Sequence, residues 1–350
     1  MTSAAQRPID ATLLGGVRTP GSVHPASGGR LGVRHEDRLE LHDRTAFLAG
    51  GPSLLHSLAL PCPSQATPLP DGSVVAAESA RIRAVGSDGH TRWALPHPVW
   101  HHGSRDPRPP GAPVVSPDGR LVCAVVPTLK PDTEERVYVR DTLLLLDTAT
   151  GAVLAERPVG SIASDLTGTW HPDGHLLALS CWTAWASWTT WWVEPRRDGL
   201  HIRGGVGMHE VVGFLPGTSR ALTLRRAEHI AVNDDRDELA AHDAASDEQT
   251  ALFDLSALAA DPENDEFTAA CLIDAAHVLV AGRIFARCRP PATRHWLCDA
   301  RTLAPLGRLR YPRRVGTAVT ALGDGTWLTR HGDELHHWAL PPTVRPAGRT

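Results

Sequence analysis

The sequence predicts an all-β protein built from repeated four-stranded antiparallel sheets, and residues 112–156 show one such sheet most clearly. Short runs rich in Val and Leu alternate there with turn sequences, and runs of this length are too short for helices. In the turns, Pro fixes φ, Asp hydrogen-bonds the backbone two residues on, and Gly accepts a positive φ. One such sheet cannot bury its own faces, so we expect the unit to recur. The strands are expected at 113–115, 121–126, 143–146 and 152–156, with turns at Ser116–Gly119 and Asp147–Gly151.

The turn that follows the first strand of this sheet does recur along the chain. The six intervals between Gly28 and Gly325 average about 50 residues, which is typical of one four-stranded propeller blade. We therefore predict a single seven-bladed β-propeller domain over residues 1–350. The turns are Pro25–Gly28, Pro70–Gly72, Pro117–Gly119, Pro172–Gly174, Pro216–Gly217, Asp274–Ala275 and Asp324–Gly325. The blades are expected at about 17–50, 64–97, 111–158, 163–206, 209–245, 266–311 and 315–342 plus 8–16.

The last blade is predicted to borrow its outer strand from the N-terminus. The tail after Leu340 is rich in proline, which cannot donate to a strand ladder. Residues 8–16 precede the first blade and have no other partner, so we expect them to close the ring. A loose N-terminal arm is the alternative.

Composition excludes several classes of protein. The chain has 350 residues, 42% of them hydrophobic, and a net charge of −4, so it shows no electrostatic signature of nucleic-acid or membrane binding. Six scattered cysteines without a C-x-x-C pair are expected to be reduced and buried. The N-terminus lacks the pattern of a secretory signal. We expect a cytoplasmic monomer without a cofactor or a metal site.

The S-P-D-G turn and the repeat length resemble the seven-bladed β-propellers of the WD-repeat kind and their bacterial relatives. The resemblance covers nearly the whole chain, although the sequence has no Trp-Asp dipeptide and its pairs Gly89-His90 and Gly174-His175 fall at different phases of the repeat. The resemblance implies a scaffold that binds proteins or peptides, with some members being enzymes. The fold alone does not decide between these functions.

The long connections are predicted to lie on one face of the propeller, and long loops on a rigid scaffold are where binding residues concentrate. These connections join second to third strands, or one blade to the next. They are Leu55–Pro63, His97–Gly111, Thr128–Tyr138, Ala245–Glu266 and Ile284–Thr293.

A tryptophan series and a histidine-rich loop are the first two candidate sites. Trp182, Trp185 and Trp188, with Trp191 and Trp192 after them, form either an exposed aromatic wall or plain packing between blades four and five. His101 and His102 could supply a general base, or they are solvated loop residues. His336 and His337 are adjacent on a strand and point to opposite faces, so they cannot chelate one metal.

Ionisable residues near the predicted channel mouth form a third candidate site. Asp165, His209, Glu210 and Glu266 are the acids and base that a hydrolase or lyase would need, or they are charged strand ends in solvent. The fourth candidate is a set of arginines that could grip carboxylates or phosphates, or form a solvated salt-bridge face. Its members are Arg225, Arg226, Arg283, Arg287, Arg289, Arg294, Arg310, Arg313, Arg314 and Arg330.

Three functions stay open at this point. The first is a non-catalytic propeller that binds a protein or peptide through Trp182, Trp185, Trp188, Arg287, Arg289, Arg313 and Arg314. The second is an enzyme of small-molecule or natural-product metabolism that uses Asp165, His209, Glu210, Glu266, His101 or His102. The third is a sensor or carrier of an anionic aromatic metabolite.

Overall fold

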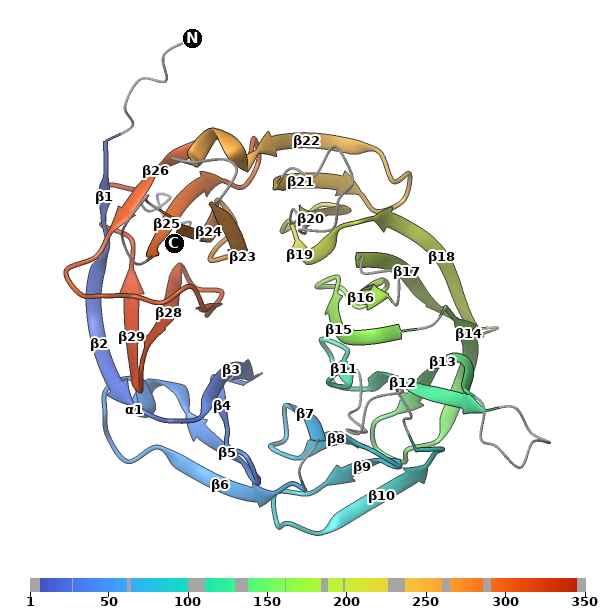
Figure 1. Ribbon diagram of the computed structural model, residues 1–350. Coiled ribbons are helices and arrows are strands. Elements are labelled where there is room, and N and C mark those ends of the chain that lie inside the picture. Colours follow the sequence, from blue (N-terminus) through green and yellow to red (C-terminus); the bar gives the residue numbers. More distant parts are fainter. Residues whose placement is uncertain are drawn as a thin grey trace. The chain divides into compact units, whose positions relative to one another are not determined.

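The computed structural model contains seven sheets whose repeated unit is four antiparallel strands, joined by tight turns (Figure 1). Helices are confined to α1 (Arg44–Leu48) and the 3-10 turn η1 (Leu255–Leu258) among the residues that the structure describes. This confirms the predicted class, an all-β seven-bladed β-propeller. The described residues are 7–26, 28–61, 64–99, 111–129, 138–160, 162–183, 188–197, 199–225, 237–259, 265–285 and 291–344.

The contacts divide the chain into two compact units. Unit 2 comprises residues 21–43 and 54–211 and holds the first four sheets. The first two sheets contain β3 (Ser22–Ala26), β4 (Arg30–Arg34), β5 (Arg38–Asp43), β6 (Leu54–Ala59), β7 (Ser64–Pro68), β8 (Val74–Glu78), β9 (Arg81–Val85) and β10 (Thr91–Pro96). The next two contain β11 (Val114–Val115), β12 (Leu121–Leu129), β13 (Tyr138–Asp147), β14 (Val153–Val159), β15 (Ile162–Trp170), β16 (Leu177–Thr183), β17 (Trp188–Arg196) and β18 (Gly199–Gly207).

Unit 1 comprises residues 1–20, 44–53 and 212–350, and it holds the last two sheets and most of the fifth. The fifth sheet contains β19 (Glu210–Phe214), β20 (Arg220–Arg225), β21 (Glu238–Asp243) and β22 (Gln249–Asp254). The sixth contains β23 (Glu266–Leu272), β24 (His277–Ile284), β25 (Ala292–Asp299), β26 (Pro305–Arg310) and β1 (Ile9–Asp10). The seventh contains β27 (Val319–Ala321), β28 (Thr326–His331), β29 (Glu334–Ala339) and β2 (Thr12–Arg18).

The burial of each strand follows its place in its sheet. All five residues of β8, a middle strand, are buried, whereas β2, at a sheet edge, alternates exposed and half-buried residues. Middle strands can therefore be continuous apolar runs, while edge strands keep one face in water. The apolar faces of neighbouring sheets pack together within each unit, as Leu143 and Leu177 do between the third and fourth sheets. Trp327 and Trp338 form the centre of the core between the sixth and seventh.

The turns have the chemistry that the sequence predicted. Asp118 accepts hydrogen bonds from the Ser116 hydroxyl at 2.6 Å and the Arg120 amide at 3.0 Å, and Gly119 has a φ of 73°. In the second kind of turn, Asp147 accepts from the Thr150 amide and hydroxyl, at 2.8 and 2.7 Å. These local bonds satisfy backbone donors where the chain reverses direction.

The N-terminal strand completes the last blade, as predicted. β2 pairs antiparallel with β29, from Thr12 opposite Ala339 to Arg18 opposite Glu334. The prediction that all of residues 8–16 belong to the last blade was wrong for Ile9 and Asp10, which form β1 and pair in parallel with β26 in the sixth sheet. There Asp10 accepts from the guanidinium of Arg310, with Nη2 2.7 Å from Oδ2.

Two segments that were predicted as long loops contain strands, and those predictions were wrong. In the first blade α1 follows β5 directly and buries Phe47, so the outer strand β6 lies at Leu54–Ala59, within the predicted loop Leu55–Pro63. In the fifth blade the third strand is β21 and the following turn is centred on Asp243, so β22 falls within Ala245–Glu266. Blade limits of 17–50 and 209–245 are therefore too early at their C-terminal ends.

Neither helical segment of the described chain is long or apolar enough to cross a membrane. Of the other predicted loops, most of His97–Gly111, Thr128–Tyr138 and Ile284–Thr293 lies outside the described residues.

Candidate functional site

A pocket of about 650 Å³ opens in unit 1 where the ends of strands from the sixth and seventh sheets meet. Its walls are the start of β25, the end of β26, the connection 311–318 between the two sheets, and the end of β28. This is the kind of inter-blade connection on which the sequence predicted binding residues. The lining residues are Pro291, Ala292, Thr293, Arg294, His295, Arg308, Leu309, Arg310, Tyr311, Arg313, Arg314, Val315, Gly316 and His331.

Five of these residues are arginines, and none is an aspartate or glutamate. Asp10 neutralises Arg310, whose side chain is 63% exposed. Within the described part of the chain, the other four, Arg294, Arg308, Arg313 and Arg314, make no ion pair with a carboxylate. Arg313 and Arg314 are exposed on the connection, while Arg294 is half-buried on β25. The pocket is therefore strongly cationic in a protein whose net charge is −4.

A buried hydrogen-bond chain fixes the wall that carries Arg313 and Arg314. His295 Nε2 lies 3.1 Å from the carbonyl oxygen of Gly316, so this nitrogen donates, and Nδ1 lies 2.7 Å from Tyr311 Oη. In the neutral tautomer Nδ1 accepts from the tyrosine hydroxyl. Trp327 Nε1 in turn donates to Tyr311 Oη at 3.2 Å. The connection 311–318 is thus held at Tyr311 and at Gly316, on both sides of the two arginines.

Burial keeps both central groups of this chain neutral. It lowers the pKa of His295 to about 4, against a weaker opposing effect of the bond to Gly316. It also raises the pKa of Tyr311 above its ordinary value. At neutral pH the network therefore adds no charge to the pocket, and the positive charge comes from the arginines.

Glycine is required at position 316 because the backbone there packs closely against the backbone of Arg330. A Cβ placed there would lie 2.4 Å from the carbonyl oxygen of Arg330, to which the Gly316 amide donates at 2.8 Å. Arg330 is itself anchored, since its guanidinium donates to the carbonyl oxygen of Thr19 at 2.7 Å. A side chain at 316 would displace the connection that shapes the pocket.

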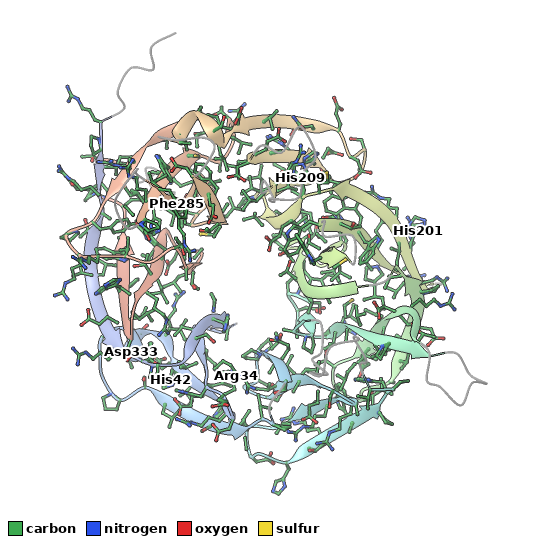
Figure 2. All side chains as sticks on the ribbon, viewed as in Figure 1. Arg34, His42, His201, His209, Phe285 and Asp333 are labelled. Atoms are coloured by element: carbon green, nitrogen blue, oxygen red, sulfur yellow. The ribbon has the colours of Figure 1, made fainter. Side chains whose placement is uncertain are left out.

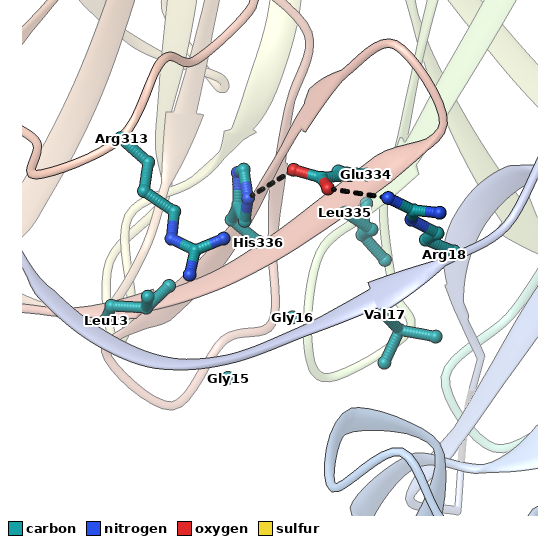
Figure 3. Close-up of a pocket in the computed structure, with 9 residues that line it drawn as sticks. All are labelled: Leu13, Gly15, Gly16, Val17, Arg18, Arg313, Glu334, Leu335 and His336. Carbon is teal, nitrogen blue, oxygen red and sulfur yellow. Dashed lines mark ion pairs between the residues drawn. The ribbon is translucent and has the colours of Figure 1, made fainter.

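A second pocket, of about 390 Å³, shares Arg313 with the first (Figure 3). Glu334 lies between His336 and Arg18, 3.4 Å from His336 Nε2 and 3.5 Å from Arg18 Nη2. Burial lowers the pKa of His336, so this ring is neutral at pH 7. The second pocket therefore mixes charges and selects an anion less strongly. It is lined by Leu13, Gly15, Gly16, Val17, Arg18, Arg313, Glu334, Leu335 and His336.

The arginine-lined pocket has the chemistry of an anion receptor. A guanidinium presents a planar set of donors that matches a carboxylate or a phosphate with two parallel bonds. Four such groups around one space, with no competing acid in the lining, can hold more than one anionic group at a time. Arg294, Arg310, Arg313 and Arg314 belong to the predicted arginine set, whereas Arg308 was not predicted. The spacing of two between Arg308 and Arg310 on a strand, which places both on one face, was the signal available.

The predicted ionisable group is spread over several elements. His209 is buried and precedes β19 (Figure 2), with its carbonyl oxygen 2.8 Å from the Thr190 hydroxyl, and Glu210 is the first residue of β19. Glu266 begins β23 and follows Asp265, which accepts from the amide of Phe285 at 2.8 Å. Asp165 lies on β15. His101 and His102 lie outside the described residues.

The predicted tryptophan wall is partly a packing feature. Trp188 on β17 is 7% exposed and meets the half-buried Trp182 of β16 edge to face, with ring centroids 6.0 Å apart. Trp192 is fully buried under the guanidinium of Arg203, 5.8 Å from its ring centre. Trp185, Arg287 and Arg289 lie outside the described residues. Of the proposed ligand-binding residues that the structure describes, Arg313 and Arg314 line the arginine-lined pocket.

The comparisons with known proteins bear on the fold. No family model matches the sequence, and no curated protein matches it significantly. Among solved structures, the chain is similar to the WD40 domain of coronin from Toxoplasma gondii, with a TM-score of 0.54 and 12% identity over 98% of this chain and 91% of that one. It is also similar to the Pan2 WD40 domain from Neurospora crassa, with a TM-score of 0.53 and 13% identity over 97% and 98%. The chain is thus a seven-bladed β-propeller with the fold of WD40 domains.

Proposed function

We propose that the protein is a non-catalytic interaction propeller that binds an acidic segment of a partner protein in the arginine-lined pocket. The observation that carries the proposal is the set of four arginines, Arg294, Arg308, Arg313 and Arg314, around a pocket whose lining has no acidic residue. The likeness to WD40 domains supports a scaffold role, since such a fold presents loops on a rigid frame.

The geometry favours an extended acidic segment over a single small anion. The pocket of about 650 Å³ is open, and its cationic groups come from two strands and one connection. A chain of glutamates or aspartates offers several carboxylates at intervals, so that different arginines engage different residues. Arginine is also one of the residue types that dominate binding energy at protein interfaces.

The test measures binding of a fluorescein-labelled peptide of eight glutamates by fluorescence anisotropy. The double variant Arg313→Glu/Arg314→Glu removes two guanidinium groups and adds two acids to the pocket, so we expect binding on the order of 100-fold weaker. The matched control is Arg197→Glu/Arg301→Glu, which makes the same change in net charge at two exposed arginines outside the pocket.

The proposal requires the control to bind the peptide like the wild type. Equal weakening in both double variants would show a general charge effect and would refute a specific site. Competition by citrate or inorganic phosphate as strong as that of the unlabelled peptide would assign the pocket to small anions instead.

A further inference from the structure

The turn between β15 and β16 brings two histidines and an aspartate together at the surface of unit 2. Its sequence is His171-Pro172-Asp173-Gly174-His175. His171 Nδ1 lies 2.7 Å from Asp173 Oδ1, and His175 Nδ1 contacts the same carboxylate oxygen. All three possible ligand atoms lie within 4.8 Å of one another, and this is the one such group among the described His, Cys, Asp and Glu residues.

The backbone of the turn creates this convergence. The His171 amide donates to Leu176 O at 2.7 Å, and the Gly174 amide donates to His171 O at 2.9 Å. Gly174 takes a φ of 79°, which glycine adopts without a steric penalty. The turn thereby places the rings of His171 and His175 with centroids 4.6 Å apart, and both Nδ1 atoms contact the same oxygen of Asp173.

The corresponding turn in the preceding sheet shows which residues are sufficient for the chain to form this reversal. There Ser116-Pro117-Asp118-Gly119-Arg120 forms the same reversal, with Asp118 accepting from the amide two residues on, as Asp173 does. Ser116 and Arg120 occupy the positions of His171 and His175 and supply no second or third metal ligand. The two histidines are therefore not required by the turn.

The donor set suits a late first-row divalent ion. Two imidazole nitrogens and one carboxylate oxygen are ligands that Zn²⁺ accepts, and water can complete a four-coordinate shell. His171 is 8% exposed and therefore anchored by packing, while His175 is exposed, so an ion from solution has access.

We propose that His171, Asp173 and His175 form a surface binding site for a divalent transition-metal ion such as Zn²⁺. The site would hold the ion through Nδ1 of both histidines and a carboxylate oxygen of Asp173. Binding of the ion would replace the two histidine–aspartate contacts by metal–ligand bonds. These bonds would stabilise the turn of the β15–β16 hairpin. The proposal is independent of the arginine-lined pocket, which lies in the other unit.

The test uses the tag-free full chain and Zn²⁺, measured by isothermal titration calorimetry and by the effect of Zn²⁺ on Tm. The matched variant is His171→Ser/His175→Arg, which copies the turn of the third sheet and so preserves the fold. We expect the wild-type chain to bind one Zn²⁺ ion and the variant to bind Zn²⁺ at least 100-fold more weakly. Zn²⁺ should raise the Tm of the wild type and leave the Tm of the variant unchanged. Mg²⁺, which prefers oxygen ligands, should not compete.

A second variant and a direct measurement keep the proposal testable if the double variant does not fold. Asp173→Asn retains the acceptor for the His175 amide but loses the charge, so we expect weaker binding with an intact turn. In the wild type, Zn²⁺ should shift the ring nitrogen signals of two histidines in NMR spectra. Equal Zn²⁺ affinity in the wild type and both variants, or unshifted histidine signals, would overturn the proposal.

Discussion

Tyr311 Oη lies 2.7 Å from Nδ1 of His295, and this bond joins the connection 311–318 to the buried middle of β25. The histidine is fully buried, and the ring of Tyr311 meets it edge to face. Arg313 and Arg314, two of the arginines that line the pocket, are thus carried by a segment that a neutral polar network holds against the core.

The variant Tyr311→Phe should destabilise the connection 311–318, because it removes a hydroxyl group and adds no volume. The change leaves the Trp327 N–H and His295 Nδ1 without their common partner, and an unsatisfied buried polar group costs about 1–3 kcal/mol. We expect the free energy of unfolding to fall by about that amount in urea denaturation. A loss below about 0.5 kcal/mol would mean that the bond contributes little.

The stability of the protein should fall as the pH falls from about 6.5 to about 4, in part through His295. Its pKa is lowered to about 4 in the fold, so the unfolded chain binds a proton at this site in a range where the folded chain does not. The contribution is fully present above pH 6.5 and is lost as pH falls toward 4, by about 3 kcal/mol. His295→Gln cannot titrate, so its unfolding free energy should depend less steeply on pH in this window.

Gly316→Ala should destabilise the protein, whereas Gly204→Ala should be nearly neutral. A Cβ at 316 would lie 2.4 Å from a backbone oxygen, but at 204 it would meet nothing within 4 Å. Since the obstacle is backbone, relief requires movement of the connection, and we expect a cost of about 1–3 kcal/mol, as for overpacking. Comparison of the Tm values of the two variants checks this, and similar values would contradict it.

Removal of residues 1–18 should be far more harmful than removal of residues 1–10. The longer deletion takes away β2, which pairs with β29 over six positions, whereas the shorter one removes only β1 and its two pairs. Without β2 the edge of β29 is left open, and open edges promote aggregation. We expect the longer deletion to yield aggregated protein in size-exclusion chromatography, and a synthetic peptide of residues 7–18 to restore part of the soluble fraction.

Binding of the acidic peptide should weaken steeply with salt. Arg308, Arg313 and Arg314 are exposed, and the screening length shortens from about 10 Å at 0.1 M salt to about 3 Å at 1 M. Anisotropy titrations at several NaCl concentrations measure this dependence. The Arg313→Glu/Arg314→Glu variant should show a shallower slope, because fewer charges then contribute.

The fold was largely predictable because its signals are local. The turns at Asp118 and Asp147 and the apolar runs between them are sufficient to define one blade, and their repetition is sufficient to count the others. The displaced strands β6 and β22 were missed because α1 and a longer β20–β21 connection shift the phase of the repeat in the first and fifth blades.

The candidate site was only partly predictable. The arginines are visible in the sequence, but the place of Arg313 and Arg314 in the pocket depends on the buried bonds of His295 and Tyr311, which no pattern reveals. The same holds for the turn 171–175. Its histidines are visible in the sequence, yet only the reversal at Gly174 turns both rings toward Asp173.

The pairing of β2 with β29 also affects folding of the chain during its synthesis. The two strands are separated by some 300 residues of chain, so at about 5–20 residues per second a ribosome needs from about 15 seconds to a minute to make the partner after the first strand has emerged. During that time the nascent chain exposes Leu13 and Val17 without their neighbours. Chaperones that shield apolar segments should therefore associate with this polypeptide near its amino end until synthesis reaches the final hairpin.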